Sequence, residues 1–139
     1  MTYSDEEVFL ALMLWREARG ENIDGKIAVA HCVLNRVSSP KWWGKTIMDV
    51  IFKKFQFSSL TDPKDKQLTT WPASADAAWQ TCLAVAGGSV SGLYKNPVPG
   101  ADSYHDTSIM PPKWATPENF VKKIGKLMFY NTDGDLGKG

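Results

Sequence analysis

The sequence contains few of the residues that cross-link small proteins. Its 139 residues include only two cysteines and two histidines. Cys32 and Cys82 lack the CxxC spacing of a metal or redox site, and each falls in an apolar helical pattern, so we expect two reduced, buried thiols. Protein zinc sites need three or four side-chain ligands, most often His and Cys, and His31 and His105 are too few to suggest one. We expect no metal and no other cofactor.

An excess of one charge and a long apolar run are also missing. The chain carries 16 Lys and Arg against 15 Asp and Glu, a net charge of +1, whereas nucleic-acid binders normally show a basic excess. The longest apolar run, residues 8–15, is far shorter than the roughly 18 residues of a membrane span. The acidic start lacks the positive region of a secretory signal. These features predict a protein made in the cytoplasm that neither binds nucleic acid nor inserts stably into a membrane.

Apolar residues, by contrast, are plentiful. Hydrophobic residues make up 43% of the chain and aromatic residues 12%, enough for the core of one compact domain over residues 1–139. The strongest helix signal covers 4–19, where Ser4 and Glu7 form a capping box and residues 8–15 are apolar on every face, as in a buried helix. Further helices are predicted over 24–38, 46–53 and 74–86. Gly87 and Gly88 are predicted to end the last one, and 58–70 to form a polar loop.

The C-terminal part has a different pattern. Proline and glycine recur over residues 89–118 and disfavour a helix there. Short strands are predicted over 101–107 and 124–130, which would pair in a small sheet, and residues 131–139 are predicted to form a frayed, flexible tail. The fold class is therefore α+β and mainly α, with a helical lobe and a small β lobe.

Glu17 is the first candidate for chemistry. It follows the apolar stretch on the inner side of the predicted buried helix, where partial desolvation would raise the pKa of its carboxyl, as a general acid requires. Position alone also allows an ordinary surface glutamate paired with Arg16 or Arg19, either of which would lower that pKa.

The surrounding residues resemble a known signature. The run Trp15-Arg16-Glu17-Ala18-Arg19-Gly20-Glu21 is similar to that of the SleB/CwlJ-type cell wall hydrolases, a family of spore-cortex-lytic enzymes and phage endolysins. The similarity continues at residues 24–30, 33–37, 56–58, 101–105 and 124–130. The resemblance implies a lysozyme-like fold and lytic transglycosylase activity on the glycan strands of peptidoglycan. It assigns the role of catalytic acid and base to Glu17, which would cleave the MurNAc-β-1,4-GlcNAc bond and leave a 1,6-anhydro product.

A second catalytic carboxylate is not evident from the sequence. Standard glycosidases use two carboxyl groups that flank the bond, and the nearest candidate, Glu21, also fits favourable placement before the next helix. Asp62, Asp65, Asp102 and Asp106 are further candidates. A hydrolytic muramidase of the same fold therefore stays open as the alternative outcome.

Short polar and aromatic motifs supply the candidates for substrate binding, which are Gln56, Phe57, Ser58, Tyr104, His105 and Trp114. The first three resemble an element that lines lysozyme-like clefts. Tyr104 and His105 would face opposite sides of a strand, with a half-buried tyrosine and a surface histidine as the plain structural interpretations. The indole of Trp114 suits the apolar face of a sugar ring. We expect the other tryptophans in irregular segments to be packing residues. We also expect a structural role for Asn35-Arg36, which lies at a helix end.

Other classes of protein receive less support. A Cys/His peptidase would need a reactive thiolate at Cys82, which the apolar helical pattern disfavours. A non-catalytic peptidoglycan-binding or structural virion protein conflicts with the intact run at 15–21. We expect a monomeric, single-domain enzyme that acts on the cell wall after release from the host cytoplasm. A phage endolysin fits this description, with a holin as an indirect partner that opens the membrane.

Overall fold

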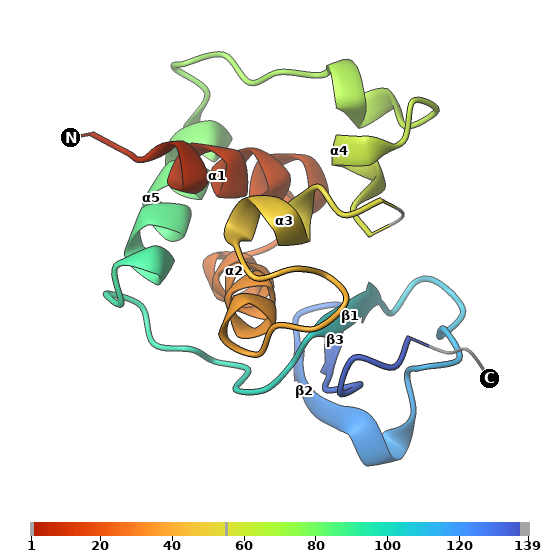
Figure 1. Ribbon diagram of the computed structural model, residues 1–139. Coiled ribbons are helices and arrows are strands. Elements are labelled where there is room, and N and C mark those ends of the chain that lie inside the picture. Colours follow the sequence, from red (N-terminus) through yellow and green to blue (C-terminus); the bar gives the residue numbers. More distant parts are fainter. Residues whose placement is uncertain (1, 55, 137–139) are drawn as a thin grey trace.

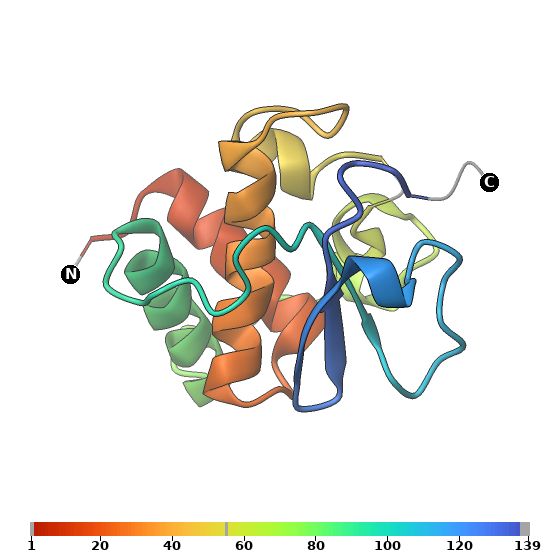
Figure 2. The ribbon, with the colours of Figure 1, turned by 90° about the horizontal axis from the view of Figure 1, so that it is seen from below.

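The computed structural model describes residues 2–54 and 56–136 of the chain (Figure 1). The helical lobe contains α1 (Asp5–Ala18), α2 (Ile23–Ser38), α3 (Ile47–Ile51), α4 (Ser58–Thr61), the 3-10 turn η1 (Lys66–Thr69) and α5 (Ala77–Val90). The β lobe contains β1 (Ser103–Asp106), the 3-10 turn η2 (Pro117–Asn119), β2 (Phe120–Ile124) and β3 (Leu127–Tyr130). In Figure 2, α2 lies between α5 and the sheet, so it is the element that joins the two lobes.

The capping signal at the start of α1 is confirmed. The Ser4 hydroxyl accepts a hydrogen bond from the Glu7 amide at 3.2 Å, and the Glu7 carboxylate accepts one from the Ser4 amide at 2.8 Å. The middle of α1 is buried on all sides, as its unbroken apolar run predicts, and Leu10, Met13 and Leu14 have no exposed surface. This helix packs against α5 and α2 and forms the centre of the core. No helix in the described part of the chain is long and apolar enough to span a membrane.

Two predictions for the helical lobe are wrong. Gly87 and Gly88 lie inside α5 and do not end it. A side chain at Gly87 would meet the ring of Tyr3, and one at Gly88 the ring of Tyr94, so these glycines make room for packing. The predicted polar loop over 58–70 contains α4 and η1, because η1 is capped by the Asp65 carboxylate, which accepts from the Gln67 amide at 2.8 Å.

The sheet has three strands in the order β1-β3-β2, all antiparallel. The predicted strand at 101–107 corresponds to β1. The predicted strand at 124–130 is divided, because Gly125 adopts a left-handed conformation (φ 57°) and turns the chain between β2 and β3. The sequence misses β2, since its Lys122 and Lys123 are exposed and give it no alternating apolar pattern.

Asn35 and Arg36, in the last turns of α2, hold the chain that leads into the sheet. The Asn35 side-chain amide donates to the carbonyls of Val98 at 2.9 Å and Ala101 at 2.8 Å. The Arg36 guanidinium donates to the carbonyl of Asp102 at 2.7 Å. The structural role predicted for this pair is confirmed, because both side chains bond to main-chain carbonyls of the segment that leads into β1.

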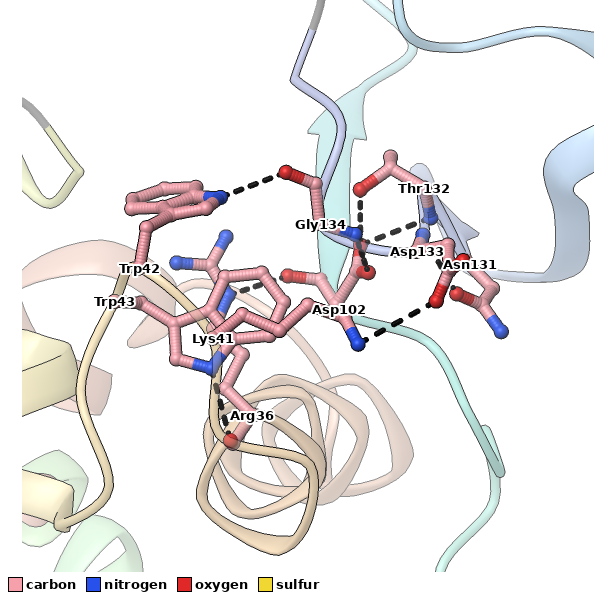
Figure 3. A network of polar contacts seen from close by, with 9 residues as sticks. All are labelled: Arg36, Lys41, Trp42, Trp43, Asp102, Asn131, Thr132, Asp133 and Gly134. Carbon is pink, nitrogen blue, oxygen red and sulfur yellow. Dashed lines mark hydrogen bonds and ion pairs between the residues drawn. The ribbon is translucent and has the colours of Figure 1, made fainter.

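Asp102 then fixes the C-terminal segment, residues 131–136 (Figure 3). One carboxylate oxygen accepts from the amide of Thr132 at 3.1 Å and from its hydroxyl at 2.9 Å, and the other accepts from the Gly134 amide at 3.3 Å. Lys41 forms an ion pair with Asp133 at 3.4 Å. Residues 131–136 are therefore a bonded part of the fold where the sequence predicts a frayed tail. The rest of that predicted tail, 137–139, lies outside the described residues.

The anchor at Asp102 predicts a large stability difference between two neighbouring carboxylates. Asp102→Ala should lower the free energy of unfolding by about 2–4 kcal/mol, because it leaves buried N–H and O–H groups without acceptors. Asp133→Ala is the matched control, since the Asp133 side chain is 93% exposed, and it should cost less than about 1 kcal/mol. Chemical denaturation of the three proteins measures both values, and equal effects would refute the anchoring role.

Candidate active site

A cavity of about 360 Å³ lies where the two lobes meet. The helical lobe contributes Glu17, Gln56 and Phe57 to its lining, and the β lobe contributes Tyr104 and Trp114. The structure thus gathers five of the residues singled out from the sequence around one space, although they come from four separate segments of the chain. Arg36 also lines this cavity.

Glu17 occupies the last turn of α1, directly beyond the buried core of that helix. Its side chain reaches the open cavity and is exposed to solvent there. The surrounding protein nevertheless raises the pKa of its carboxyl, chiefly by desolvation. The hydroxyl and amide of Ser59 lower that pKa, and the negative charge of Asp65 raises it further. The balance favours a carboxyl that keeps its proton to a higher pH than an ordinary glutamate.

The two neighbouring arginines do not neutralise Glu17. The Arg16 guanidinium donates to the carbonyls of Ser59 at 3.0 Å and Thr70 at 3.2 Å. The Arg19 guanidinium donates to the Trp15 carbonyl and to the Gln67 side chain, both at 3.0 Å. Neither forms an ion pair with Glu17 within the described residues. The surface-glutamate interpretation, which required such a pair, does not describe this site.

Among the acidic residues considered as a second carboxylate, Asp65 is the one whose charge acts on Glu17. The Ser58 hydroxyl donates to its carboxylate at 2.6 Å, and this bond and that of the Gln67 amide lower the pKa of Asp65. Its carboxylate is therefore ionised at neutral pH. By contrast, Asp102 is used as an anchor, and Glu21 and Asp106 each lie 3.7 Å from the Lys126 ammonium.

Tyr104 presents a hydroxyl that the protein leaves unused. The hydroxyl oxygen is buried, and no residue in the described part of the chain forms a hydrogen bond with it. Burial, together with the negative charge of Glu17, raises the pKa of Tyr104 well above its usual value. The hydroxyl therefore stays protonated and can donate. Because a buried donor without a partner is costly, a ligand in this cavity is its natural acceptor.

Arg36 and Gln56 form the polar floor of the cavity. The Arg36 guanidinium donates to the Gln56 side-chain carbonyl at 3.2 Å, which leaves the Gln56 amide N–H groups directed elsewhere. Arg36 also lies 6.0 Å from the Phe57 ring centre and 4.8 Å from that of Trp43. A structural role was predicted for Arg36 because it lies near a helix end, and its place in the lining of the site was not predicted.

Two predicted binding residues lie outside the cavity lining. The His105 ring is buried and stacks on Tyr130 at 5.5 Å, with the indole of Trp114 edge-on at 6.2 Å. Within β1, Tyr104 lines the cavity and His105 does not. The hydroxyl of Ser58 donates to Asp65. A direct contact with substrate is not supported for His105 or Ser58, and each instead orients a neighbour that is closer to the site.

The two cysteines are free and buried, as the sequence predicts. Burial raises the pKa of Cys32 to about 12 and that of Cys82 to about 11. A thiolate nucleophile at Cys82 is therefore unfavourable, which argues against the Cys/His peptidase. Within residues 2–54 and 56–136, no group of three or more His, Cys, Asp or Glu side chains is placed to hold a metal ion.

Comparison with known proteins gives consistent matches. The sequence profile of the Cell Wall Hydrolase family matches residues 20–130. The chain is 32% identical to a spore cortex-lytic enzyme of Oceanobacillus iheyensis, over 91% of this chain and 42% of that protein. It is 31% identical to one of Bacillus subtilis, over 91% of this chain and 38% of that protein. The chain thus spans less than half the length of these curated relatives.

Two solved structures share the fold. The catalytic domain of the germination-specific lytic transglycosylase SleB from Bacillus anthracis superposes with a TM-score of 0.71 and 29% identity, covering 92% of this chain and 96% of that one. The catalytic domain of the Bacillus cereus SleB protein gives a TM-score of 0.66 and 30% identity, covering 93% and 92%. The lysozyme-like α+β architecture expected from the sequence is therefore shown.

The raised pKa of Glu17 predicts a measurable pH effect. We expect its side-chain carboxyl to titrate above its ordinary value of 4.5 in a carbon-detected NMR titration. Since folding then favours the protonated form, the folded state loses stability as the pH rises through this pKa. Glu17→Gln removes that loss, so its free energy of unfolding should increase relative to wild type over the same pH range. A titration at or below the ordinary value would contradict the desolvated site.

Proposed function

The chain belongs to the Cell Wall Hydrolase family, and from that premise we propose that it cleaves the glycan strands of peptidoglycan, with Glu17 as the catalytic group. The observation that carries the proposal is Glu17, a carboxyl whose pKa the surrounding protein raises, in a cavity that both lobes line. The family profile begins at Gly20, three residues after Glu17. The role of Glu17 therefore rests on the geometry of the cavity and on the resemblance of residues 15–21.

The first step is protonation of the leaving group. The protonated carboxyl of Glu17 donates its proton to the glycosidic oxygen between MurNAc and GlcNAc, and the bond between that oxygen and the muramic anomeric carbon breaks. Positive charge develops on the anomeric carbon and its ring oxygen. A raised pKa keeps the proton available for this step. The ionised Asp65, whose field already reaches Glu17, favours the positive charge that develops.

The second step returns the proton to Glu17. The Glu17 carboxylate takes the proton from the muramic 6-hydroxyl, whose oxygen bonds to the anomeric carbon and closes the 1,6-anhydro ring. Glu17 ends as it began, protonated, and no water is consumed. Tyr104 of the β lobe and Gln56 of the helical lobe supply donors to the cavity and would hold the hydroxyl or N-acetyl groups of the sugar in place.

A hydrolytic muramidase is the second candidate, and Asp65 is the observation that favours it. A carboxylate that stays ionised within electrostatic reach of the acid is the second group that a hydrolase requires. In that case a water molecule would attack the anomeric carbon in place of the 6-hydroxyl. The products distinguish the two reactions, since only the hydrolase leaves a reducing muramic end.

The biological setting follows from the wall that the enzyme degrades. The relatives are named spore cortex-lytic enzymes, whereas we predict from the sequence a phage endolysin that is released through a holin-made lesion. Digestion of purified spore cortex and of vegetative cell wall by the same protein separates these roles. An endolysin should clear vegetative walls at least as fast as cortex, and the reverse preference would favour a role in germination.

Replacing Glu17 tests the assignment of the catalyst. Glu17→Gln keeps the shape of the side chain but cannot donate and accept the proton, so we expect the rate of wall clearing to fall by at least about 100-fold. Mass spectrometry of the sugars that the wild type releases should find 1,6-anhydro muramic ends.

Glu21→Gln is the matched control. Glu21 belongs to the same sequence run, but it lies near Lys126 and does not line the cavity, so this variant should keep most of the wild-type rate. Equal clearing by wild type and Glu17→Gln would refute the assignment of the catalyst. Released peptides with intact glycan strands would refute the glycosidase itself.

A further inference from the structure

A second cavity adjoins the one that contains Glu17. It has a volume of about 600 Å³ and is lined by Trp42, Gln56 and residues 133–136. Gln56 and Leu136 line both cavities. The two spaces are therefore parts of one groove, which runs from Glu17 past Gln56 to the indole of Trp42.

Trp42 is an exposed aromatic ring with a fixed orientation. Its residue surface is 42% exposed, yet its indole N–H donates to the Gly134 carbonyl at 2.7 Å (Figure 3). The ring also packs edge-on against Trp43, with ring centres 5.2 Å apart. Trp43 in turn is buried and donates to the Arg36 carbonyl at 2.9 Å. An exposed indole normally rotates freely, so these contacts give the groove a rigid apolar surface.

The C-terminal segment forms the wall of the second cavity that adjoins Trp42. Asp102 holds this segment through Thr132 and Gly134, and Lys41 holds it through Asp133 (Figure 3). Backbone and carboxylate oxygens of this segment line the same cavity as the Trp42 ring and the Gln56 amide. A flat apolar face with hydrogen-bonding groups at its rim matches a pyranose, whose C–H face is apolar and whose edge carries hydroxyls.

We propose that Trp42 and residues 133–136 form a further glycan-binding subsite, which takes a sugar of the same strand at a distance from the bond that Glu17 cleaves. Asp102 acts as a positioning residue, since it holds the wall without lining the second cavity. The proposal rests on the proposed function, because it requires that a glycan strand occupies the Glu17 cavity. It adds that the enzyme grips long strands more tightly than short ones.

Binding measured without turnover tests this subsite. In the Glu17→Gln background, calorimetry with peptide-free peptidoglycan fragments compares an octasaccharide, which can span the groove, with a disaccharide, which cannot. Trp42→Ala should weaken octasaccharide binding about tenfold, while Trp42→Phe, which keeps an aromatic face, should stay within about threefold. Disaccharide affinity should be unchanged in both variants. Thermal unfolding of each variant verifies that it is folded.

Trp71→Ala is the matched control, because Trp71 is 67% exposed but lines neither cavity. It should leave octasaccharide affinity unchanged. NMR adds a local readout: the indole N–H signal that Trp42→Phe removes is that of Trp42, and it should shift when octasaccharide is added.

Three results would overturn the subsite. The first is an octasaccharide affinity of Trp42→Ala within about twofold of the unsubstituted value. The second is an equal loss of octasaccharide affinity in Trp42→Ala and Trp42→Phe. The third is no binding of octasaccharide at all. Equal losses would mean that the indole N–H supports the wall and that the ring contacts no sugar. Failure of the proposed function is recognised separately, as wall clearing that does not depend on Glu17, and that result leaves the comparison of affinities intact.

Discussion

The hydrogen bonds from the end of α2 to the chain before β1 determine where the two lobes meet. Asn35 and Arg36 donate to three main-chain carbonyls, those of Val98, Ala101 and Asp102. Because Asp102 also holds the C-terminal segment, one buried cluster positions both β1, which bears Tyr104, and the segment that faces Trp42. Val98, Ala101 and Asp102 are buried, and these bonds fix the main chain that leads into β1.

This arrangement separates the acid from the charges that would neutralise it. Arg16 and Arg19 flank Glu17 in sequence, yet main-chain carbonyls and Gln67 take up their donors. The pKa of Glu17 is therefore determined by desolvation, by Ser59 and by the negative charge of Asp65. The same desolvation keeps the Tyr104 hydroxyl protonated across the cavity. A single carboxyl can therefore hold a proton, release it to a leaving group and take one back, and donors nearby can orient a sugar.

Local signals predicted most of the helices, and long-range contacts account for what the sequence could not show. The capping box and the apolar run locate α1, whereas β2 has no apolar alternation that would reveal it. Gly87 and Gly88 resemble a helix end in the sequence, and only the structure shows that the rings of Tyr3 and Tyr94 pack against them. At the site, the motif around Glu17 and the short motifs at 56–57 and 104 identified cavity residues. Arg36 was missed as one of them because its partners Gln56, Asp102 and Ser103 lie 20, 66 and 67 residues away.

In the proposed reaction, the Glu17 carboxyl serves first as acid and then as base, and no water takes part. Digestion of purified peptidoglycan in heavy-oxygen water tests it most directly, since the mass of each released muramic end records the atom that attacked the anomeric carbon. We expect 1,6-anhydro ends without heavy oxygen from the wild type, and release by Glu17→Gln that is slower by at least about 100-fold. Heavy oxygen at a reducing muramic end would contradict this expectation and would assign the attacking group to water.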